Sequence, residues 1–418
     1  MMGLRRVVIS GLGALTPIGN DVNTLWASLV DGVSGAGPIT RFNAEKFKTK
    51  FACEVKGYDP LNFFDKKEVR KYDLFSQFGI VAADEAINDS GFKQGNYNPE
   101  RVGVIWASGI GGIMTLTEEI RAYVTGDGTP RFSPFFIPKM ISDITSGHIA
   151  IKHGFMGPNF STVSACASSA NAIVDAFNNI QRGKADIIIT GGSEASISEA
   201  GIGGFNAMHA LSTLNDDPRA ASRPFDKDRD GFVVAEGAAA LVLEDMEHAL
   251  ARGARIYCEI AGAGLSADAY HITSPHPEGA GAAIAMRLAI EDAKLQPSDL
   301  DHINTHGTST PQGDIAEVKA IMKVFGEHVY NLNINSTKSM TGHLLGAAGA
   351  IEALATVLAV YYDIVPPTIN HFTDDPEINP ALNFTFHKAQ QRTVNAAISN
   401  TFGFGGHNAS ILMQKFFK

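Results

Sequence analysis

The sequence predicts an α/β protein built from two similar halves. Three kinds of segment occur twice in the same order: a strand that ends in a glycine turn, an amphipathic helix with the pattern Ala-Ile-x-Asp, and an apolar strand that ends in small residues. The pairs are residues 6–14 and 258–265, residues 86–89 and 289–292, and residues 185–192 and 394–400. Such self-similarity indicates internal duplication. Strands that alternate with helices in each half favour parallel or mixed sheets covered by helices.

The boundary between the halves is predicted at an Arg-Gly-Ala-Arg turn at 252–255. It gives an N-terminal half of residues 1–253 and a C-terminal half of residues 254–418. Two insertions in the first half, residues 39–65 and 123–138, are rich in Phe and Pro. We expect them to be ordered excursions that cap one face.

The bulk composition is that of a globular protein with a large core. The 418 residues are 44% hydrophobic and 19% charged, and the net charge of −10 argues against a general role on nucleic acids or anionic membranes. The three cysteines are few, odd in number and far apart, which favours a reducing compartment. The strand-like residues 7–10 are too short for a signal-peptide core, and the apolar tract 353–362 is too short to span a bilayer. We expect a cytoplasmic protein.

Cys166 is the first candidate for chemistry. Residues 160–163 favour a strand, whereas residues 167–177 carry small and apolar side chains at helical spacing. Cys166 is therefore expected in the first turn of a helix, where free N–H groups and the macrodipole lower a thiol pKa and favour the thiolate. The alternative is a buried structural cysteine, although the Ser-rich setting and the downstream histidines favour the nucleophile.

His306 closes a predicted strand and is followed by Gly307 and three hydroxyl residues, a place where a polar side chain projects from a sheet edge. The alternative is a histidine that only satisfies hydrogen bonds. His302 and His306 are also spaced like metal ligands. On a strand, however, four residues separate them by about 13 Å, too far to share one ion.

Residues 335–352 are the counterpart of the Cys166 segment in the second half. A strand and a turn with Lys338 lead to His343 at the start of a helix of small and apolar residues. Pseudo-symmetry would bring the two helix starts, and so Cys166 and His343, toward one centre. Glu352 on this helix is either solvated or a buried anion, and burial requires a partner, for which Lys338 is favoured.

The loop at residues 400–408, Asn-Thr-Phe-Gly-Phe-Gly-Gly-His-Asn, follows the last core strand. Its backbone is a candidate N–H donor to a thiolate, with Phe404 as a movable gate. The alternative is an ordinary turn between two strands.

Two other patterns are interpreted as structural. Residues 226–231 begin like a calcium loop, but Gly237 stands where the bidentate Glu is required, and the paired glycines of the two strand turns lack the third glycine of a dinucleotide fingerprint.

Five motifs in this order resemble those of the β-ketoacyl-acyl carrier protein synthases of the elongating class, type II synthases above all, over essentially the whole length. They are Val-Ser-Ala-Cys-Ala-Ser-Ser at 163–169, Arg-Pro-Phe-Asp-Lys-Asp-Arg-Asp-Gly-Phe at 223–232, Thr-His-Gly-Thr-Ser-Thr at 305–310, Lys-Ser-Met-Thr-Gly-His-Leu-Leu-Gly-Ala-Ala-Gly at 338–349, and Gly-Phe-Gly-Gly at 403–406. The resemblance implies the thiolase fold, a five-layered αβαβα arrangement of two pseudo-symmetric halves, and a homodimer.

The resemblance also implies roles for individual residues. Cys166 would carry the acyl chain, His306 and His343 match the paired histidines, and Lys338 and Glu352 match the supporting ion pair. Thr308 and Thr310 match the hydroxyls that bind the pantetheine arm, Phe404 matches the gate, and Ile110 lies where the family's acyl pocket ends. The oxyanion would be held by the N–H groups of Cys166 and Phe404.

The implied reaction is the decarboxylative condensation of that acyl chain with malonyl-acyl carrier protein, in which the two imidazoles stabilise the enolate. No metal or redox cofactor is required by this chemistry. The alternatives are a polyketide ketosynthase with the same triad, a thioester hydrolase that uses Cys166 and His306, and a non-catalytic acyl-binding subunit, which the presence of the nucleophile disfavours.

The implied partner is an acidic acyl carrier protein, which the net charge should repel. At physiological salt, charges are screened over about 8 Å, so local charged patches and not the net charge decide the attraction. The residues that match the family's docking positions are Lys67, Arg70, Lys71 and Arg131. Two positions depart from the family pattern. His209 stands where an arginine is common, so docking is expected to be weaker or pH-sensitive, and His407 replaces the usual threonine after the glycine loop.

Overall fold

The computed structural model describes residues 3–93, 95 and 97–417. The strands are β1 Val7–Leu15, β2 Gly37–Pro38, β3 Phe51–Ala52, β4 Val102–Ala107, β5 Asn159–Thr162, β6 Ile187–Glu194, β7 Gly237–Asp245, β8 Cys258–Ala267, β9 His302–Asn304, β10 Asn333–Asn335, β11 Ile364–Val365, β12 Gln390–Gln391, β13 Ala396–Gly403 and β14 His407–Gln414.

The α-helices are α1 Val22–Val30, α2 Lys66–Val69, α3 Leu74–Ser90, α4 Ile113–Thr125, α5 Phe136–Met140, α6 Ile144–His153, α7 Ser168–Gln181, α8 Glu199–Ala207, α9 Met246–Ala251, α10 Ala280–Asp292, α11 Pro311–Phe325, α12 Lys338–Thr341 and α13 Ala348–Tyr362. The 3₁₀ helices are η1 Pro60–Asn62, η2 Pro99–Arg101, η3 Pro218–Ala220, η4 Pro297–Asp299, η5 Gly326–Asn331 and η6 Leu345–Ala347.

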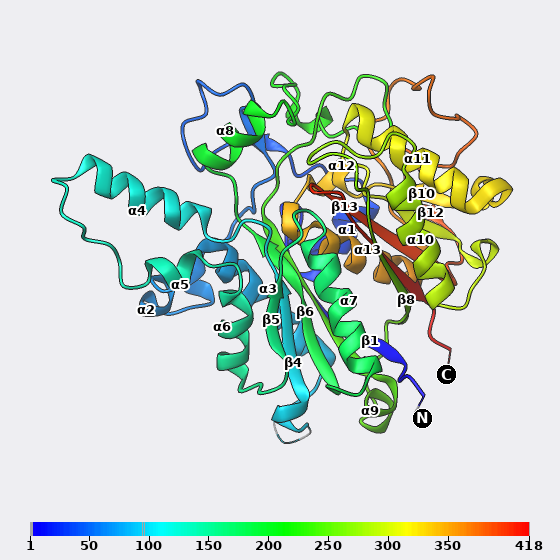
Figure 1. The fold of residues 1–418 in the computed structure, drawn as a ribbon, viewed down its shortest axis with the longest axis horizontal. Coiled ribbons are helices and arrows are strands. Elements are labelled where there is room, and N and C mark those ends of the chain that lie inside the picture. Colours follow the sequence, from blue (N-terminus) through cyan, green and yellow to red (C-terminus); the bar gives the residue numbers. More distant parts are fainter. Residues whose placement is uncertain (1–2, 94, 96, 418) are drawn as a thin grey trace.

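Ten strands form one mixed sheet whose order is symmetric about its centre: β10-β9-β13-β14-β8-β1-β7-β6-β4-β5. Each half of the chain contributes five neighbouring strands, and the two sets join where β1 pairs antiparallel with β8 through three residue pairs, from Val7↔Ile260 to Ile9↔Cys258. The predicted duplication is therefore visible as a pseudo-two-fold axis between β1 and β8. Figure 1 shows the strands passing through the middle of the molecule with helices on either side.

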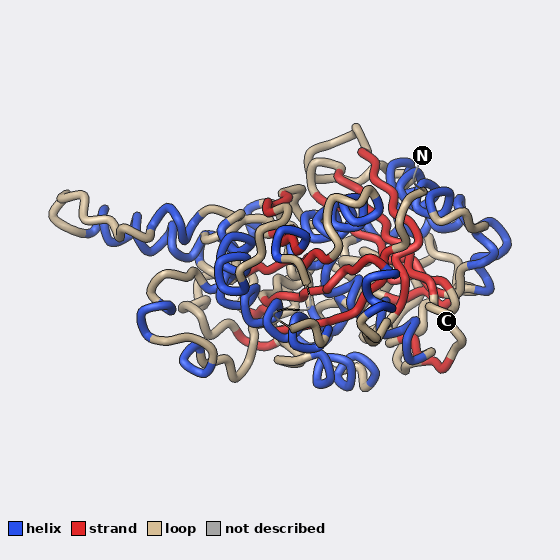
Figure 2. Tube along the Cα trace, turned by 90° about the horizontal axis from the view of Figure 1, so that it is seen from below, coloured by secondary structure: helices blue, strands red, loops and turns tan. Residues whose placement is uncertain are grey.

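The helices form three layers around these two half-sheets. α3 and α6 cover the outer face of the first half-sheet, and α10, together with α11 beside it, covers the second. α7 packs against α13 between the half-sheets. Three hydrophobic clusters follow the same division, one in the middle and one under each outer layer. The five-layered αβαβα arrangement expected from the sequence is thus observed, and Figure 2 shows helices above and below the strands.

The duplicated glycines are needed for close packing of a helix on a strand. A Cβ at Gly11 or Gly13 would lie 2.3 or 1.9 Å from a carbonyl oxygen of α3, and a Cβ at Gly262 or Gly264 would lie 2.4 or 2.0 Å from a carbonyl oxygen of α10. No side chain fits at such distances. These glycines are structural, but the expectation that they form turns at the strand ends is wrong, because β1 and β8 continue through them to Leu15 and Ala267.

The duplicated aspartates also have equivalent contacts. Asp89 of α3 accepts a hydrogen bond from the Leu12 N–H at 3.0 Å, and Asp292 of α10 accepts one from the Ala263 N–H at 3.0 Å. Each aspartate thus satisfies a backbone donor on the neighbouring strand where the glycines bring helix and strand together.

The helical stretch at residues 345–362 is long and apolar enough to cross a bilayer, but 89% of it is buried inside the molecule. It comprises η6 and α13, which packs in the middle layer against α7, β13 and β7. Its apolar character therefore serves the core between the two half-sheets.

The insertion at residues 123–138 begins in α4 and ends in α5. α4 and the loop after it extend away from the body, at the left of Figures 1 and 2. Large apolar side chains on this arm are exposed, namely Leu116, Ile120, Tyr123, Val124, Phe132, Phe135 and Ile137. We call this segment, residues 113–138, the α4 arm.

Candidate active site

Cys166 lies in a tight turn between β5 and α7. The preceding residue, Ala165, has a positive φ of 52°, which is strained for a residue other than glycine. The hydroxyl of Ser168 holds the turn, because it accepts from the Ser164 N–H at 2.9 Å and donates to the Ala165 carbonyl at 2.6 Å. α7 begins at Ser168 with Ala167 as its N-cap. The expectation that Cys166 lies inside the first turn is wrong by two residues.

Burial raises the pKa of the Cys166 thiol to about 11, opposite to the fall expected from a helix start. A hydrogen bond from the Phe404 N–H and the nearby Lys338 charge lower the pKa, whereas Glu194 and Glu352 raise it. Desolvation outweighs the favourable contacts because a thiolate loses more hydration than it recovers. The free thiol is therefore neutral, and ionisation has to be coupled to the reaction.

His343 lies against the thiol. Its Nε2 is 3.1 Å from Cys166 Sγ. The backbone of His343 is fixed on both sides, because its N–H donates to the Val233 carbonyl at 2.7 Å and its carbonyl accepts from the Ala235 N–H at 2.9 Å. The ring also packs edge-on against Phe232, with centroids 5.2 Å apart.

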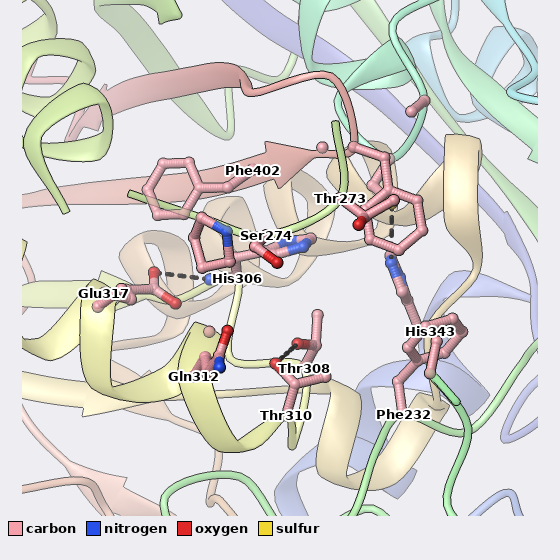
Figure 3. Close-up of a pocket in the computed structure, with 18 of the residues that line it drawn as sticks. Phe232, Thr273, Ser274, His306, Thr308, Thr310, Gln312, Glu317, His343 and Phe402 are labelled. Atoms are coloured by element: carbon pink, nitrogen blue, oxygen red, sulfur yellow. Dashed lines mark hydrogen bonds between the residues drawn. The ribbon is translucent and has the colours of Figure 1, made fainter. Parts of the chain in front are cut away.

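His306 follows β9 and faces the same space. Its ring is 5.3 Å from that of His343, nearly perpendicular to it, and 5.9 Å from that of Phe402. Both carboxylate oxygens of Glu317 on α11 anchor the turn, accepting from the N–H groups of His306 and Gly307 at 2.8 Å each. Figure 3 shows the Glu317 contact and the two imidazoles pointing into one pocket.

Both imidazoles are held in the neutral form. Burial, followed by the Lys338 charge, keeps the pKa of His306 and of His343 well below the ordinary value. Each neutral ring keeps one N–H donor, and the Nδ1 atoms of both rings have no protein partner among the described residues. Neutral donors can stabilise a developing negative charge without being cations.

Lys338 and Glu352 form the predicted ion pair, and both side chains are almost fully buried, at 1% and 2% exposure. Burial raises the pKa of Glu352, which the Lys338 ammonium and the Thr401 hydroxyl oppose. The alternative of a solvated Glu352 is excluded. The pair places a compensated positive charge near the histidines and the thiol.

One cavity of about 560 Å³ contains the three groups. The donor atoms of Cys166, His306 and His343 lie within 4.8 Å of one another, so a thiol of the first half meets two imidazoles of the second. Ile110, Thr308, Thr310 and Phe404 also line it. The hydroxyls of Thr308 and Thr310 are 3.0 Å apart and lie together on one side of the pocket in Figure 3.

The glycine loop of residues 403–406 joins β13 to β14 and lies over the Cys166 turn. A Cβ at Gly403 would lie 2.8 Å from the Ser164 carbonyl oxygen and 3.1 Å from the Cys166 nitrogen. This close approach allows the Phe404 N–H to reach the sulfur. His407 packs against the loop, since a Cβ at Gly405 would lie 2.7 Å from its Nε2.

The predicted docking residues lie on the surface, apart from the cavity lining. Lys67, Arg70 and Lys71 are exposed on and just after α2. Arg131 is exposed on the α4 arm and pairs with Asp127 at 3.2 Å. His209 is exposed but lines the cavity mouth.

The residues that hold the site in place were not predicted from the sequence. Glu317 and Glu194 are buried carboxylates whose partners are mostly backbone amides. Arg229 lies in the motif at residues 223–232, and no contact was predicted for it. It is 2% exposed and donates to the Thr310 and Pro311 carbonyls at 3.1 and 2.8 Å. The only sequence feature that pointed to a structural role for Arg229 was its place among the aspartates of residues 226–230.

Asp226, the first carboxylate of the pattern that begins like a calcium loop, has a structural role. Its carboxylate accepts from the N–H groups of Phe372 and Thr373 at 2.6 and 2.8 Å and pairs with Arg223 at 3.1 Å. These contacts join the segment at residues 223–226 to residues 372–373.

Comparison with known families assigns both halves. Residues 4–249 match the β-ketoacyl synthase N-terminal domain, and residues 257–372 match the C-terminal domain. The chain belongs to the β-ketoacyl synthase family. Relatives named 3-oxoacyl-[acyl-carrier-protein] synthase 2 are 48% identical in Synechocystis sp. and 49% identical in Staphylococcus aureus, covering 99% of this chain and 98% or more of theirs. These full-length relatives confirm the resemblance to type II synthases.

Solved ketosynthases have the same fold. The ishigamide ketosynthase/chain length factor matches with a TM-score of 0.92 at 33% identity, covering 99% of this chain and all of that one. A β-ketoacyl synthase from Burkholderia phymatum matches with a TM-score of 0.91 at 34% identity and the same coverage. The thiolase fold expected from the motifs is confirmed.

Proposed function

We propose that this β-ketoacyl synthase condenses an acyl chain on Cys166 with malonyl-acyl carrier protein and releases a β-ketoacyl-acyl carrier protein longer by two carbons. The observation that carries this proposal is the convergence of one thiol and two neutral imidazoles within 4.8 Å in a single cavity. Full-length relatives named for this synthase activity support it.

The first step is acyl transfer. The Cys166 sulfur attacks the thioester carbonyl of the acyl donor, a new C–S bond forms, and the departing pantetheine thiol takes the proton that Cys166 gives up. The Nε2–H of His343, 3.1 Å from the sulfur, is placed to donate to it as negative charge develops there. The N–H groups of Cys166 and Phe404 stabilise the oxyanion, and each donor contributes about 3 kcal/mol in the transition state.

The second step is decarboxylation and condensation. The malonyl C–C bond breaks, carbon dioxide leaves, and the electron pair becomes an enolate whose oxygen accepts hydrogen bonds from His306 and His343. The enolate carbon then attacks the acyl thioester, and the C–S bond to Cys166 breaks to release a thiolate, which takes a proton from water to regenerate the thiol. The low pKa of both imidazoles suits this role, since neutral N–H donors do not transfer a proton that would quench the carbanion.

Substitution of each histidine by alanine tests these roles. Acylation of Cys166, followed by mass spectrometry of the intact protein, should be retained at least in part in the His306→Ala variant, whereas release of carbon dioxide from malonyl carrier protein should fall by two or more orders of magnitude in both variants. Unimpaired decarboxylation in both variants would remove the histidines from the mechanism.

A polyketide ketosynthase is the second candidate. Solved relatives at 33–34% identity include the ishigamide ketosynthase and a type II polyketide ketosynthase. The test is the carrier-bound product formed from an acyl donor and excess malonyl carrier protein without reductases. One added two-carbon unit supports the fatty acid reaction, repeated additions indicate polyketide assembly, and free acid indicates a hydrolase.

An acyl carrier protein is the proposed partner, docking at Lys67, Arg70, Lys71 and Arg131. One solved relative is a ketosynthase in complex with its type II acyl-carrier protein, and the four cations here are exposed in a chain of net charge −10. The double variant Lys67→Glu/Arg70→Glu should raise the KM for malonyl carrier protein and weaken its salt dependence. An unchanged KM at low ionic strength would place docking elsewhere.

A homodimer is proposed because the α4 arm exposes apolar side chains that the single chain leaves uncovered. Sedimentation equilibrium of the Val124→Asp/Ile137→Asp variant should show monomers, whereas the control Leu250→Asp, on α9 far from the arm, should remain dimeric. A monomeric wild-type protein would contradict the proposal.

We also propose a cytoplasmic enzyme without a metal or redox cofactor. The three cysteines are free, which fits a reducing compartment. Because the three catalytic donor atoms are close enough to share an ion, the condensation rate should be measured after chelation. An unchanged rate is expected, and a loss that zinc restores would show a metal enzyme.

A further inference from the structure

Glu194 is a buried carboxylate that the proposed mechanism does not use. It is the last residue of β6, and none of its side chain is exposed. A buried charge without a cation is tolerated only when hydrogen bonds replace its hydration. The structure pairs no lysine or arginine with Glu194 among the described residues, so its contacts must come from elsewhere.

Donors from two separate segments surround the carboxylate. Oε2 accepts from the Gly109 N–H at 2.8 Å and from the Gly346 N–H at 3.0 Å. Oε1 accepts from the Ile110 N–H at 3.3 Å and from the hydroxyls of Ser108 and Ser196 at 3.1 and 3.3 Å. Burial raises the pKa of Glu194 to about 7, while these donors lower it.

The two segments meet at glycines. A Cβ at Gly346 would lie 2.1 Å from the Gly109 nitrogen and 2.8 Å from Glu194 Oε2, so the backbones touch with the carboxylate between them. Gly109, Ile110 and Gly346 all line the catalytic cavity. Gly346 follows His343 by three residues, whereas Ile110 is the residue assigned to the end of the acyl pocket.

We propose that Glu194 is a positioning residue that fixes the acyl-pocket loop at residues 108–111 to the segment after His343 and thereby sets the acyl chain length that the enzyme accepts. This inference rests on the proposed function. A loop held at two amides and one hydroxyl cannot move Ile110 to admit a longer chain without breaking buried hydrogen bonds, so the pocket has a sharp limit. Hydrophobic pockets of fixed shape discriminate a single methylene by roughly 10- to 200-fold.

The variant Glu194→Gln tests this. The amide oxygen of the glutamine can take the place of Oε2 and keep the hydrogen bonds from the Gly109 and Gly346 N–H groups. Its NH₂ group then takes the place of Oε1, where the hydroxyls of Ser108 and Ser196 can rotate to accept from it. Only the Ile110 N–H loses its acceptor, because it faces another donor. Rates of Cys166 acylation should be measured by intact-protein mass spectrometry with saturated acyl carrier donors of 4 to 18 carbons. We expect the ratio between the preferred length and the next longer one to fall about tenfold, with little change for the shortest chains.

Ser196→Ala is the matched control, because it removes a contact to Glu194 but none to the loop, and its length profile should follow the wild type. In the double variant Ile110→Ala/Glu194→Gln, the profile should equal that of Ile110→Ala alone, as expected if Glu194 acts through Ile110. Ser108→Ala, which removes a loop contact to the carboxylate, should shift the profile in the same direction if Glu194→Gln does not fold.

A Glu194→Gln or Ser108→Ala profile parallel to the wild type, or additive effects in the double variant, would overturn the proposal. A wild-type protein that no acyl carrier donor acylates at Cys166 would instead refute the proposed function, so the two failures are distinguishable.

Discussion

Gly403→Ala should disconnect the Phe404 N–H from Cys166. The added Cβ would lie 2.8 Å from the Ser164 carbonyl oxygen and 3.1 Å from the nitrogens of Cys166 and Ala167. These are backbone atoms in a turn that Ser168 holds by two hydrogen bonds. The loop of residues 403–406, a turn between two strands, is the part expected to move.

The magnitude follows from the lost donor. One oxyanion donor contributes about 3 kcal/mol, which corresponds to a rate reduction of roughly 100- to 1000-fold. The same shift removes a contact that lowers the Cys166 pKa, so fewer thiols ionise at a given pH. We therefore expect single-turnover acylation of Cys166 to slow by at least two orders of magnitude.

The assay is rapid-quench acylation followed by mass spectrometry of the intact protein. Gly204→Ala in α8 is the control, because a Cβ there meets no atom within 4 Å. Its acylation rate should equal the wild-type rate, with a small gain in thermal stability. Acylation of Gly403→Ala within threefold of the wild type would refute the assignment of Phe404 as an oxyanion donor.

Three further predictions concern the buried charges and the pantetheine site. Lys338→Met should lower the unfolding free energy by about 3–5 kcal/mol by leaving Glu352 unpaired, and Lys338→Met/Glu352→Gln should recover more than half in urea titrations; full stability of the single variant would contradict this. The pKa of His343 is depressed in the folded protein, so below pH 6.5 the unfolded chain binds more protons than the folded one. As the pH is lowered from 6.5, the unfolding free energy of the wild type should therefore fall, by up to about 1.4 kcal/mol per pH unit more than that of His343→Asn. Parallel pH profiles of the two proteins would contradict this. Thr310→Val should raise the KM for malonyl carrier protein about two- to tenfold with kcat within twofold in steady-state assays, and an unchanged KM would place the pantetheine arm elsewhere.

The duplication was predictable because its signals are local. Gly11 and Gly262 appear in the sequence as strand-ending glycines, and the structure shows that each is required by the same helix–strand approach, at 2.3 and 2.4 Å from a carbonyl oxygen. Asp89 and Asp292 repeat the same contact to the backbone. Each of these contacts requires one residue type at one position, so the duplication leaves a repeated pattern in the sequence.

The electrostatics of the thiol was not predictable in the same way. A position near the start of α7 suggested a low pKa, but burial raises the pKa of Cys166. Burial depends on which distant segments cover the turn, here the loop at 403–406 and the segment around His343. The anchoring roles of Glu194 and Glu317 were not predicted for a related reason. Their main partners are backbone amides, and because almost every residue has one, no sequence pattern shows which amides a carboxylate will bind.

The meeting of Cys166 and His343 follows from the contact between the two middle-layer helices. A Cβ at Gly349, in the first turn of α13, would lie 2.8 Å from the Ala170 nitrogen of α7, and the Ala350 N–H donates to the Ser169 hydroxyl at 2.9 Å. The helix starts therefore touch, and the residues just before them face each other across the pseudo-two-fold axis. The two equivalent segments therefore meet at this point, one with a thiol and the other with an imidazole, and together they supply a nucleophile and its partner.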